Sequence, residues 1–70
     1  MTNSTVPLGE LLDMDETAQR LKRPVATLRW WRHRGEGPRS FLLGRRVMYR
    51  AADVDAWIAE HYTADSRGST

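Results

Sequence analysis

The chain has 70 residues, a net charge of +2 and no cysteine, and its two histidines are His33 and His61. This length allows one small domain, and the absence of cysteine excludes disulfides and thiolate metal sites. No apolar run approaches the roughly 18 residues of a membrane span, and the N-terminus lacks a secretion-signal pattern. We therefore expect a cytoplasmic protein with no membrane partner, no metal site and no cofactor.

The small net charge hides a segregation of charges along the chain. Residues 20–50 contain ten Lys or Arg and one acid, a balance of +9, whereas residues 1–19 and 51–70 carry −4 and −3. Nine of these ten basic residues are arginine, whose planar guanidinium suits contacts with phosphate and guanine. A basic centre between acidic flanks favours a polyanion-binding face over a merely solvated surface.

Residues 1–10 show no periodicity and are expected to form a flexible lead-in. The first helix is predicted to begin at Asp13, because Asp13 and Glu16 have the spacing of a capping box. This helix must end near Lys22, since the residue before Pro24 is biased away from helical angles.

A second helix is predicted to begin at Pro24 or Val25 and to stop at Gly35, a suitable left-handed cap. It contains two adjacent tryptophans, and neighbouring helical positions lie about 100° apart, so the two cannot share a face. Trp31 falls on the apolar stripe that includes Val25 and is predicted to be the core tryptophan. Trp30 falls on the outward, polar face.

After the second helix, two short apolar runs, SFLL and VMYR, are joined by residues 44–46. This pattern predicts a β-hairpin in which glycine supplies the turn. A third helix is predicted to begin near Ala51. Its expected apolar stripe consists of Val54, Trp57, Ile58 and Tyr62. The folded part should therefore span residues 11–62, with residues 63–70 as a flexible tail.

The order helix, short turn, helix, hairpin, helix predicts a small α+β, mainly helical fold, the winged helix-turn-helix. In that fold the second helix enters the DNA major groove and the hairpin is the wing. Residues 11–58 resemble the small MerR-like winged helix-turn-helix proteins that include phage excisionases, which are recombination directionality factors. The resemblance rests on the T-L-R-x-W-R helix, the G-x-G-P exit, the L-G-R-R-V-x-Y-R wing and the closing D-V-x-A-W.

The resemblance implies sequence-directed binding of double-stranded DNA by the second helix and the wing. The predicted DNA-binding residues are Arg23, Ala26, Thr27, Arg29, Trp30, His33, Arg45 and Arg46. Within this set, Ala26, Trp30 and His33 would face the bases, and Thr27 and Arg29 would lie near phosphate. Arg45 and Arg46 would form the wing tip. The excisionase branch further implies cooperative filaments that bend attachment-site DNA and steer an integrase towards excision.

This sequence departs from the family pattern at three positions. Lys22 occupies a turn position where glycine is usual, and Pro24 stands where serine often caps the recognition helix. Trp30 stands where an arginine is frequent, which leaves its role open. It could contact a thymine methyl or sugar, contact another protomer, or pack against the hairpin.

Catalysis is not expected. Asp13, Asp15 and Glu16 fit the cap and first turn of a helix, and no Ser or Cys nucleophile is evident near His33. A small-molecule ligand is also not expected, because the sequence leaves no room for an effector domain after the third helix.

Two alternatives to an excisionase remain open at this point. One is a small phage or plasmid transcription regulator on the same scaffold, and the other is a protein-interaction adaptor whose basic face binds an acidic partner. In the excisionase interpretation, several copies would lie head-to-tail on DNA. The acidic flank of one copy would then contact exposed basic residues of the next copy.

Overall fold

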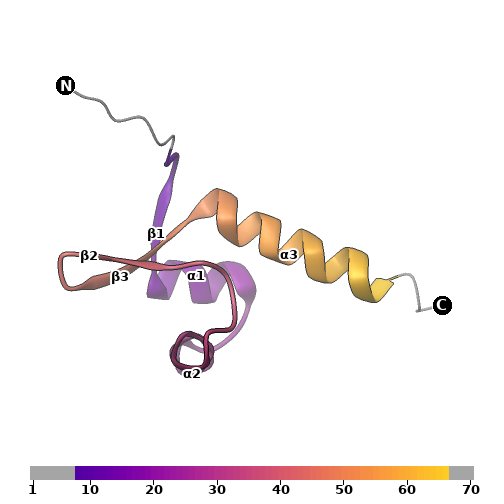
Figure 1. The fold of residues 1–70 in the computed structure, drawn as a ribbon, viewed down its shortest axis with the longest axis horizontal. Coiled ribbons are helices and arrows are strands. Elements are labelled where there is room, and N and C mark those ends of the chain that lie inside the picture. The colour runs from indigo at the N-terminus through magenta and orange to yellow at the C-terminus, as the bar shows by residue number, and fades with distance from the viewer. Residues whose placement is uncertain (1–7, 67–70) are drawn as a thin grey trace.

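The computed structural model describes residues 8–66, so the rest of the predicted lead-in and tail lies outside the described residues. Its elements are β1 (Leu11–Asp13), α1 (Met14–Leu21), α2 (Val25–Arg34), β2 (Phe41–Leu43), β3 (Arg46–Arg50) and α3 (Ala51–Ser66). The strands form one antiparallel sheet in the order β1-β3-β2. Helices α1 and α2 lie on one side of the hairpin, and α3 leads away from its base (Figure 1). This architecture confirms the predicted small α+β fold, a helix-turn-helix with a β wing.

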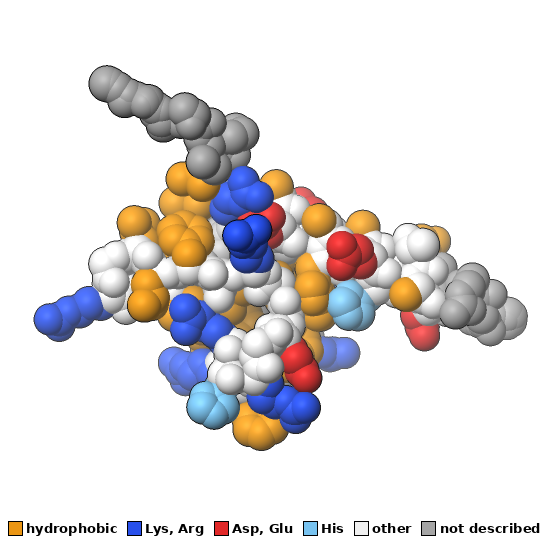
Figure 2. Space-filling view, viewed as in Figure 1, with side chains coloured by type: hydrophobic (Ala, Val, Ile, Leu, Met, Phe, Trp, Pro, Cys, Tyr) orange, Lys and Arg blue, Asp and Glu red, His pale blue; other side chains and the backbone are white. Residues whose placement is uncertain are grey.

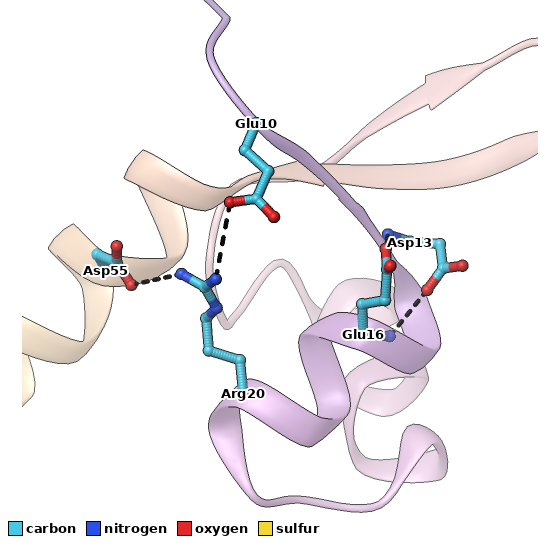
Figure 3. A network of polar contacts seen from close by, with 5 residues as sticks. All are labelled: Glu10, Asp13, Glu16, Arg20 and Asp55. Carbon is cyan, nitrogen blue, oxygen red and sulfur yellow. Dashed lines mark hydrogen bonds and ion pairs between the residues drawn. The ribbon is translucent and has the colours of Figure 1, made fainter.

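The start of α1 is fixed by the predicted capping box. Asp13 Oδ1 accepts a hydrogen bond from the Glu16 backbone N–H at 2.8 Å, and Glu16 Oε1 accepts one from the Asp13 N–H at 2.9 Å (Figure 3). Two amides without helical partners are thereby satisfied. Thr17 is fully buried, and its hydroxyl donates a hydrogen bond to the Asp13 carbonyl at 2.8 Å. The buried hydroxyl therefore has a hydrogen-bond partner.

The turn between α1 and α2 comprises residues 22–24. Lys22 is left-handed (φ 58°, ψ 44°), and among the described residues it is the only one besides glycines with a positive φ. In this conformation the Arg23 N–H donates to the Ala18 carbonyl at 3.0 Å, which closes the end of α1. Pro24 is the extended N-cap residue of α2 and provides no side-chain capping bond. The predicted helix boundaries here are confirmed to within one residue.

Strand β1 is not predicted by the sequence pattern. It pairs with β3, where Leu12 lies opposite Tyr49, and both side chains are buried. A strand this short is too brief for its alternation of side chains to be detected locally, and its partner lies far along the chain. The Glu10 carbonyl accepts a hydrogen bond from the Ala51 N–H at 2.9 Å, which extends the contact to the start of α3.

Strands β2 and β3 form the predicted hairpin. Leu43 and Arg46 are its last pair, so Gly44 and Arg45 make a two-residue loop. Gly44 has a φ of 66° and Arg45 has no positive φ, which is the combination of a type II′ turn. Arg46 therefore belongs to β3, and the connection is one residue shorter than predicted.

The buried core lies between the sheet and the helices. It consists of Leu12, Ala18, Leu28, Tyr49, Ala51 and Val54. Trp31 is only partly buried, at the edge of this cluster, where its ring centroid lies 5.2 Å from that of Trp57. Gly37 approaches the same ring so closely that a Cβ there would lie 3.1 Å from Cε3 of Trp31. Trp31 therefore joins α2 to α3 and to the segment before β2, rather than filling the centre of the core.

Helix α3 is longer and less buried than predicted. It continues to Ser66, so residues 63–66 are helical where the sequence predicts an irregular tail. Ile58 and Tyr62 are 37% and 72% exposed, so the predicted apolar stripe is not buried beyond Trp57, although Trp57, Ile58 and Tyr62 line one groove. The reason is that only the first half of α3 reaches the core, while its second half extends beyond the sheet (Figure 1).

Ion pairs connect the start of α3 to neighbouring parts of the domain. The Arg50 guanidinium donates two hydrogen bonds to the Asp53 carboxylate, at 2.7 and 2.8 Å, and this bonding is the main reason that the pKa of Asp53 is lowered. Arg20 of α1 lies 3.1 Å from Asp55 and 3.9 Å from Glu10 (Figure 3). These contacts orient α3 relative to α1 and β1.

Replacing Lys22 with glycine is expected to stabilise the fold. A residue with a Cβ in the left-handed region costs about 1–2 kcal/mol, part of which is offset because glycine makes the unfolded chain more flexible. The net gain should be about 0.5–1 kcal/mol, which thermal denaturation followed by circular dichroism would detect as a rise of a few degrees in Tm. Lys22→Ala is the matched control, since it keeps the Cβ; an equal rise for both variants would contradict this explanation.

Candidate nucleic-acid interface

Helix α2 has one buried and one open face. Leu28 is fully buried in the core. The open face carries the predicted residues Ala26, Thr27, Arg29, Trp30 and His33, of which only Thr27 is partly buried. A helix that is free along one side fits the DNA major groove, which is about 12 Å wide.

A groove of about 520 Å³ separates α2 from the wing. Its lining consists of Asp13, Met14, Asp15, Val25, Arg29, Arg32, His33, Arg46 and Val47. The structure thus brings together three residues of the predicted set, Arg29 and His33 from α2 and Arg46 from β3. Arg32 joins them, and the two acids stand at the start of α1. The groove is a mainly basic concavity between the two elements that a winged helix-turn-helix applies to DNA.

Arg32 is a groove residue that the sequence interpretation missed. Its Nε donates to Ser40 Oγ at 2.9 Å, which holds the side chain between α2 and the segment leading to β2. Burial raises the pKa of Tyr49, and the nearby positive charge of Arg32 partly offsets that rise. The signal available in the sequence was spacing, because Arg32 follows Arg29 by three positions and shares its side of the helix.

The wing ends in two consecutive arginines. Arg45 is exposed in the loop, and Arg46 Nη2 lies 3.9 Å from Asp13 Oδ2, which is a long ion pair between an exposed guanidinium and a partly buried carboxylate. Such a pair contributes little stability, so a phosphate can replace it at low cost. In Figure 2, Lys and Arg side chains surround α2, and one stands at the outer end of the hairpin.

Part of the predicted set lies outside the groove lining, namely Arg23, Ala26, Thr27, Trp30 and Arg45. Arg23 is in the α1–α2 turn, where its Nη1 donates to the Lys22 carbonyl at 3.3 Å. Trp30 is 56% exposed, and the Arg34 guanidinium lies over its ring, 5.2 Å from the centroid. This cation–π contact is within α2, and Trp30 is not part of the core cluster. Contact with DNA or with another protomer stays a prediction.

The described residues contain no group of three or more His, Asp or Glu that could hold a metal ion. His61 stacks on Trp57 with ring centroids 4.0 Å apart, and its Nδ1 lies 2.8 Å from the Trp57 carbonyl. Within residues 8–66, none of the helices has the length and apolar character needed to cross a membrane.

A helix pair, an adjoining two-stranded wing and a basic groove between them define the class of winged helix-turn-helix DNA-binding domains. The helix-turn-helix domain family matches residues 11–62, and the chain belongs to this family. Membership implies DNA binding, and domains of this kind are typically non-catalytic. No curated protein and no solved structure matches the chain.

The two adjacent tryptophans should respond differently to replacement by alanine. Trp31→Ala removes the ring that joins α2 to α3 and should lower the free energy of unfolding by about 3 kcal/mol. Trp30→Ala removes an exposed ring, so it should leave Tm nearly unchanged and weaken DNA binding or assembly. Thermal melts and fluorescence anisotropy check the two effects. Equal destabilisation by both changes would mean that the faces of α2 are wrongly assigned.

Proposed function

We propose that this protein is an excisionase-type architectural DNA-binding protein acting in the cytoplasm of a bacterial host. It binds repeated sites cooperatively and bends attachment-site DNA, so that an integrase acts in the direction of prophage excision. The observation that carries the proposal is the groove between α2 and the wing, in which Arg29, Arg32, His33 and Arg46 converge. The resemblance of residues 11–58 to excisionases supports this branch of the family.

Cooperative binding follows from the small footprint of one domain. A single winged module buries only about 600–1,000 Å² on DNA, so one copy should bind weakly and with limited specificity. Several copies side by side would raise the specificity of the assembly. A neighbour's basic rim would meet α3, which contains four acids and no Lys or Arg. Two of these acids, Glu60 and Asp65, lie on its second half. Such a head-to-tail contact need not close into a ring.

The two alternative functions differ from an excisionase in the experiments that would reveal them. A small transcription regulator would use the same groove, so DNA binding alone does not separate it from an excisionase. The deciding experiment is integrase-driven excision with and without this protein, using an integrase encoded beside its gene. Excision that is unchanged by the protein would favour the regulator. An adaptor with an acidic protein partner would instead show weak DNA affinity that is insensitive to sequence.

DNA affinity is expected to fall steeply with salt. Arg29, Arg45, Arg46 and a few neighbours should neutralise roughly four to six phosphates, which gives a slope of log K against log salt of about −4 to −5. Arg46→Ala should reduce the magnitude of this slope by about 1 in fluorescence anisotropy titrations. Arg20→Ala is the control, because Arg20 is paired with Asp55 on the α3 side of the domain. A slope near zero would refute the basic face as the DNA surface.

The free protein is expected to be a monomer that fills closely repeated sites stepwise and cooperatively. Glu60→Gln together with Asp65→Asn should weaken this cooperativity in gel shifts and leave the affinity for a single site unchanged, because the two acids lie away from the groove. Sedimentation without DNA checks the monomer. A stable dimer, or independent filling of adjacent sites with no change in DNA curvature, would contradict the architectural role.

A further inference from the structure

Two consecutive leucines of the wing are exposed to solvent. Leu42 is 59% exposed and Leu43 is 54% exposed. Both lie on β2, which pairs with β3 at the edge of the sheet, so no described strand covers its outer side. Neither leucine belongs to the core cluster or lines the groove between α2 and the wing. Adjacent exposed leucines beside a basic binding surface indicate a contact outside the domain.

The strand register places the two leucines on opposite faces of the hairpin. Leu42 pairs with Val47 and Leu43 pairs with Arg46, and side chains alternate between faces along a strand. Val47 packs against the core, so Leu42 continues the core face of the sheet towards the tip. Leu43 lies on the other face, in the last pair before the loop. Each face of the wing end therefore carries one leucine, and Leu43 shares its face with Arg46.

Arginines frame the leucine pair. Arg45 is in the loop, Arg46 is opposite Leu43, and Arg39 lies two residues before β2, and all three are exposed. Cations at the end of a hairpin are attracted by the negative potential of the DNA minor groove, which is about 6 Å wide. Apolar side chains that enter this groove can separate base steps and kink the duplex towards the major groove.

We propose that Leu42 and Leu43 form an apolar wedge that the wing inserts into the DNA minor groove. This inference rests on the proposed DNA-binding function and adds a physical source for the bend. With α2 in the major groove and Arg45 at the phosphates, Leu43 enters between two base pairs because it is nearest the loop. Leu42 packs against the sugars of the groove wall.

A second copy of the chain is a poorer partner for this strand. Antiparallel pairing of two β2 edges centred on Leu42 would set Arg39 of each copy opposite Arg45 of the other. Like charges directly opposite one another destabilise a strand pair. A strand of three residues offers few hydrogen bonds to offset that repulsion. The polyanionic backbone of DNA, by contrast, attracts the same arginines.

The test compares Leu42→Ala, Leu43→Ala and the double variant with the unchanged protein on a short duplex selected from a random-sequence pool. Energy transfer between the duplex ends measures bending, and 2-aminopurine in place of each adenine in turn reports unstacking. Leu8→Ala is the matched control, because Leu8 is 41% exposed but precedes β1, at the end of the sheet away from the loop. All variants should melt near the temperature of the unchanged protein, since each leucine is exposed.

The double variant should bind about tenfold more weakly, with a smaller bend and a smaller rise in 2-aminopurine fluorescence, because the apolar area buried by the leucines is lost. Its salt slope should not change, since no phosphate contact is removed. Arg45→Ala should instead reduce the magnitude of the slope by about 1. Leu43→Met keeps an apolar side chain of similar volume and should retain the bend.

Equal bending and equal 2-aminopurine signals for the double variant and the unchanged protein would overturn the wedge and leave DNA binding intact. Loss of cooperative filling with an unchanged bend at a single site would also overturn it, and would assign the leucines to contacts between copies. Failure of the unchanged protein to bind any selected duplex would refute the proposed function, and the wedge with it.

Discussion

The position of the wing relative to the helix pair depends on Asp13. Its backbone is paired with Met48 of β3 at the end of β1, and its side chain is the N-cap of α1. Sheet and helix therefore meet at one residue, with no linker between them. Its carbonyl accepts the Thr17 hydroxyl, and its second carboxylate oxygen lies 3.9 Å from Arg46. The wing and α1 cannot shift independently, so this junction sets the geometry of the groove between the wing and α2.

The fold also divides the basic residues into two groups that the sequence presents as one block. Arg20, Arg34 and Arg50 lie within 3.2 Å of acidic partners, so part of their charge is used within the domain. Among the groove arginines, Arg46 has a longer ion pair, at 3.9 Å from Asp13. Charge counted along the chain therefore overstates the cations available to DNA. Only the fold shows which guanidinium groups can exchange their contacts for phosphate.

Elements with strong local signals could be predicted from the sequence. The capping box at Asp13, the proline after the first helix and the glycines at the ends of α2 and β2 each specify a local backbone conformation. Strand β1 could not be predicted, because it is stabilised by pairing with β3 rather than by its own sequence. The end of α3 was missed because no Gly or Pro stands between Ala51 and Gly68 to mark a stop, and the sequence pattern shows no other signal for the last turn.

The candidate site also has residues that could be predicted from the sequence and residues that could not. The exposed face of α2 follows from the helical period, so the outward positions of Arg29 and His33 were predictable from the sequence. Arg32 lines the groove while bonded to Ser40, a contact made across the turn into β2 that no local pattern reports. The exposure of Leu42 and Leu43 likewise depends on where the core ends beneath the hairpin. Apolar runs in a predicted strand are normally assigned to the interior.

Bending and cooperative binding are physically coupled in the proposed arrangement. Bending a site by 40–90° costs on the order of 1–6 kcal/mol, which is a large demand on the small footprint of one winged module. Several copies can share that cost, because each wing needs to deform only the base steps that it contacts. A bend made by one copy also brings the basic residues of the copy on the next site closer to Glu60 and Asp65 of its α3. Occupancy then promotes further occupancy through the shape of the DNA, and weak contacts between copies suffice. A simple regulator needs only to fill its site. An architectural protein in this arrangement must also produce a bend that grows with each added copy.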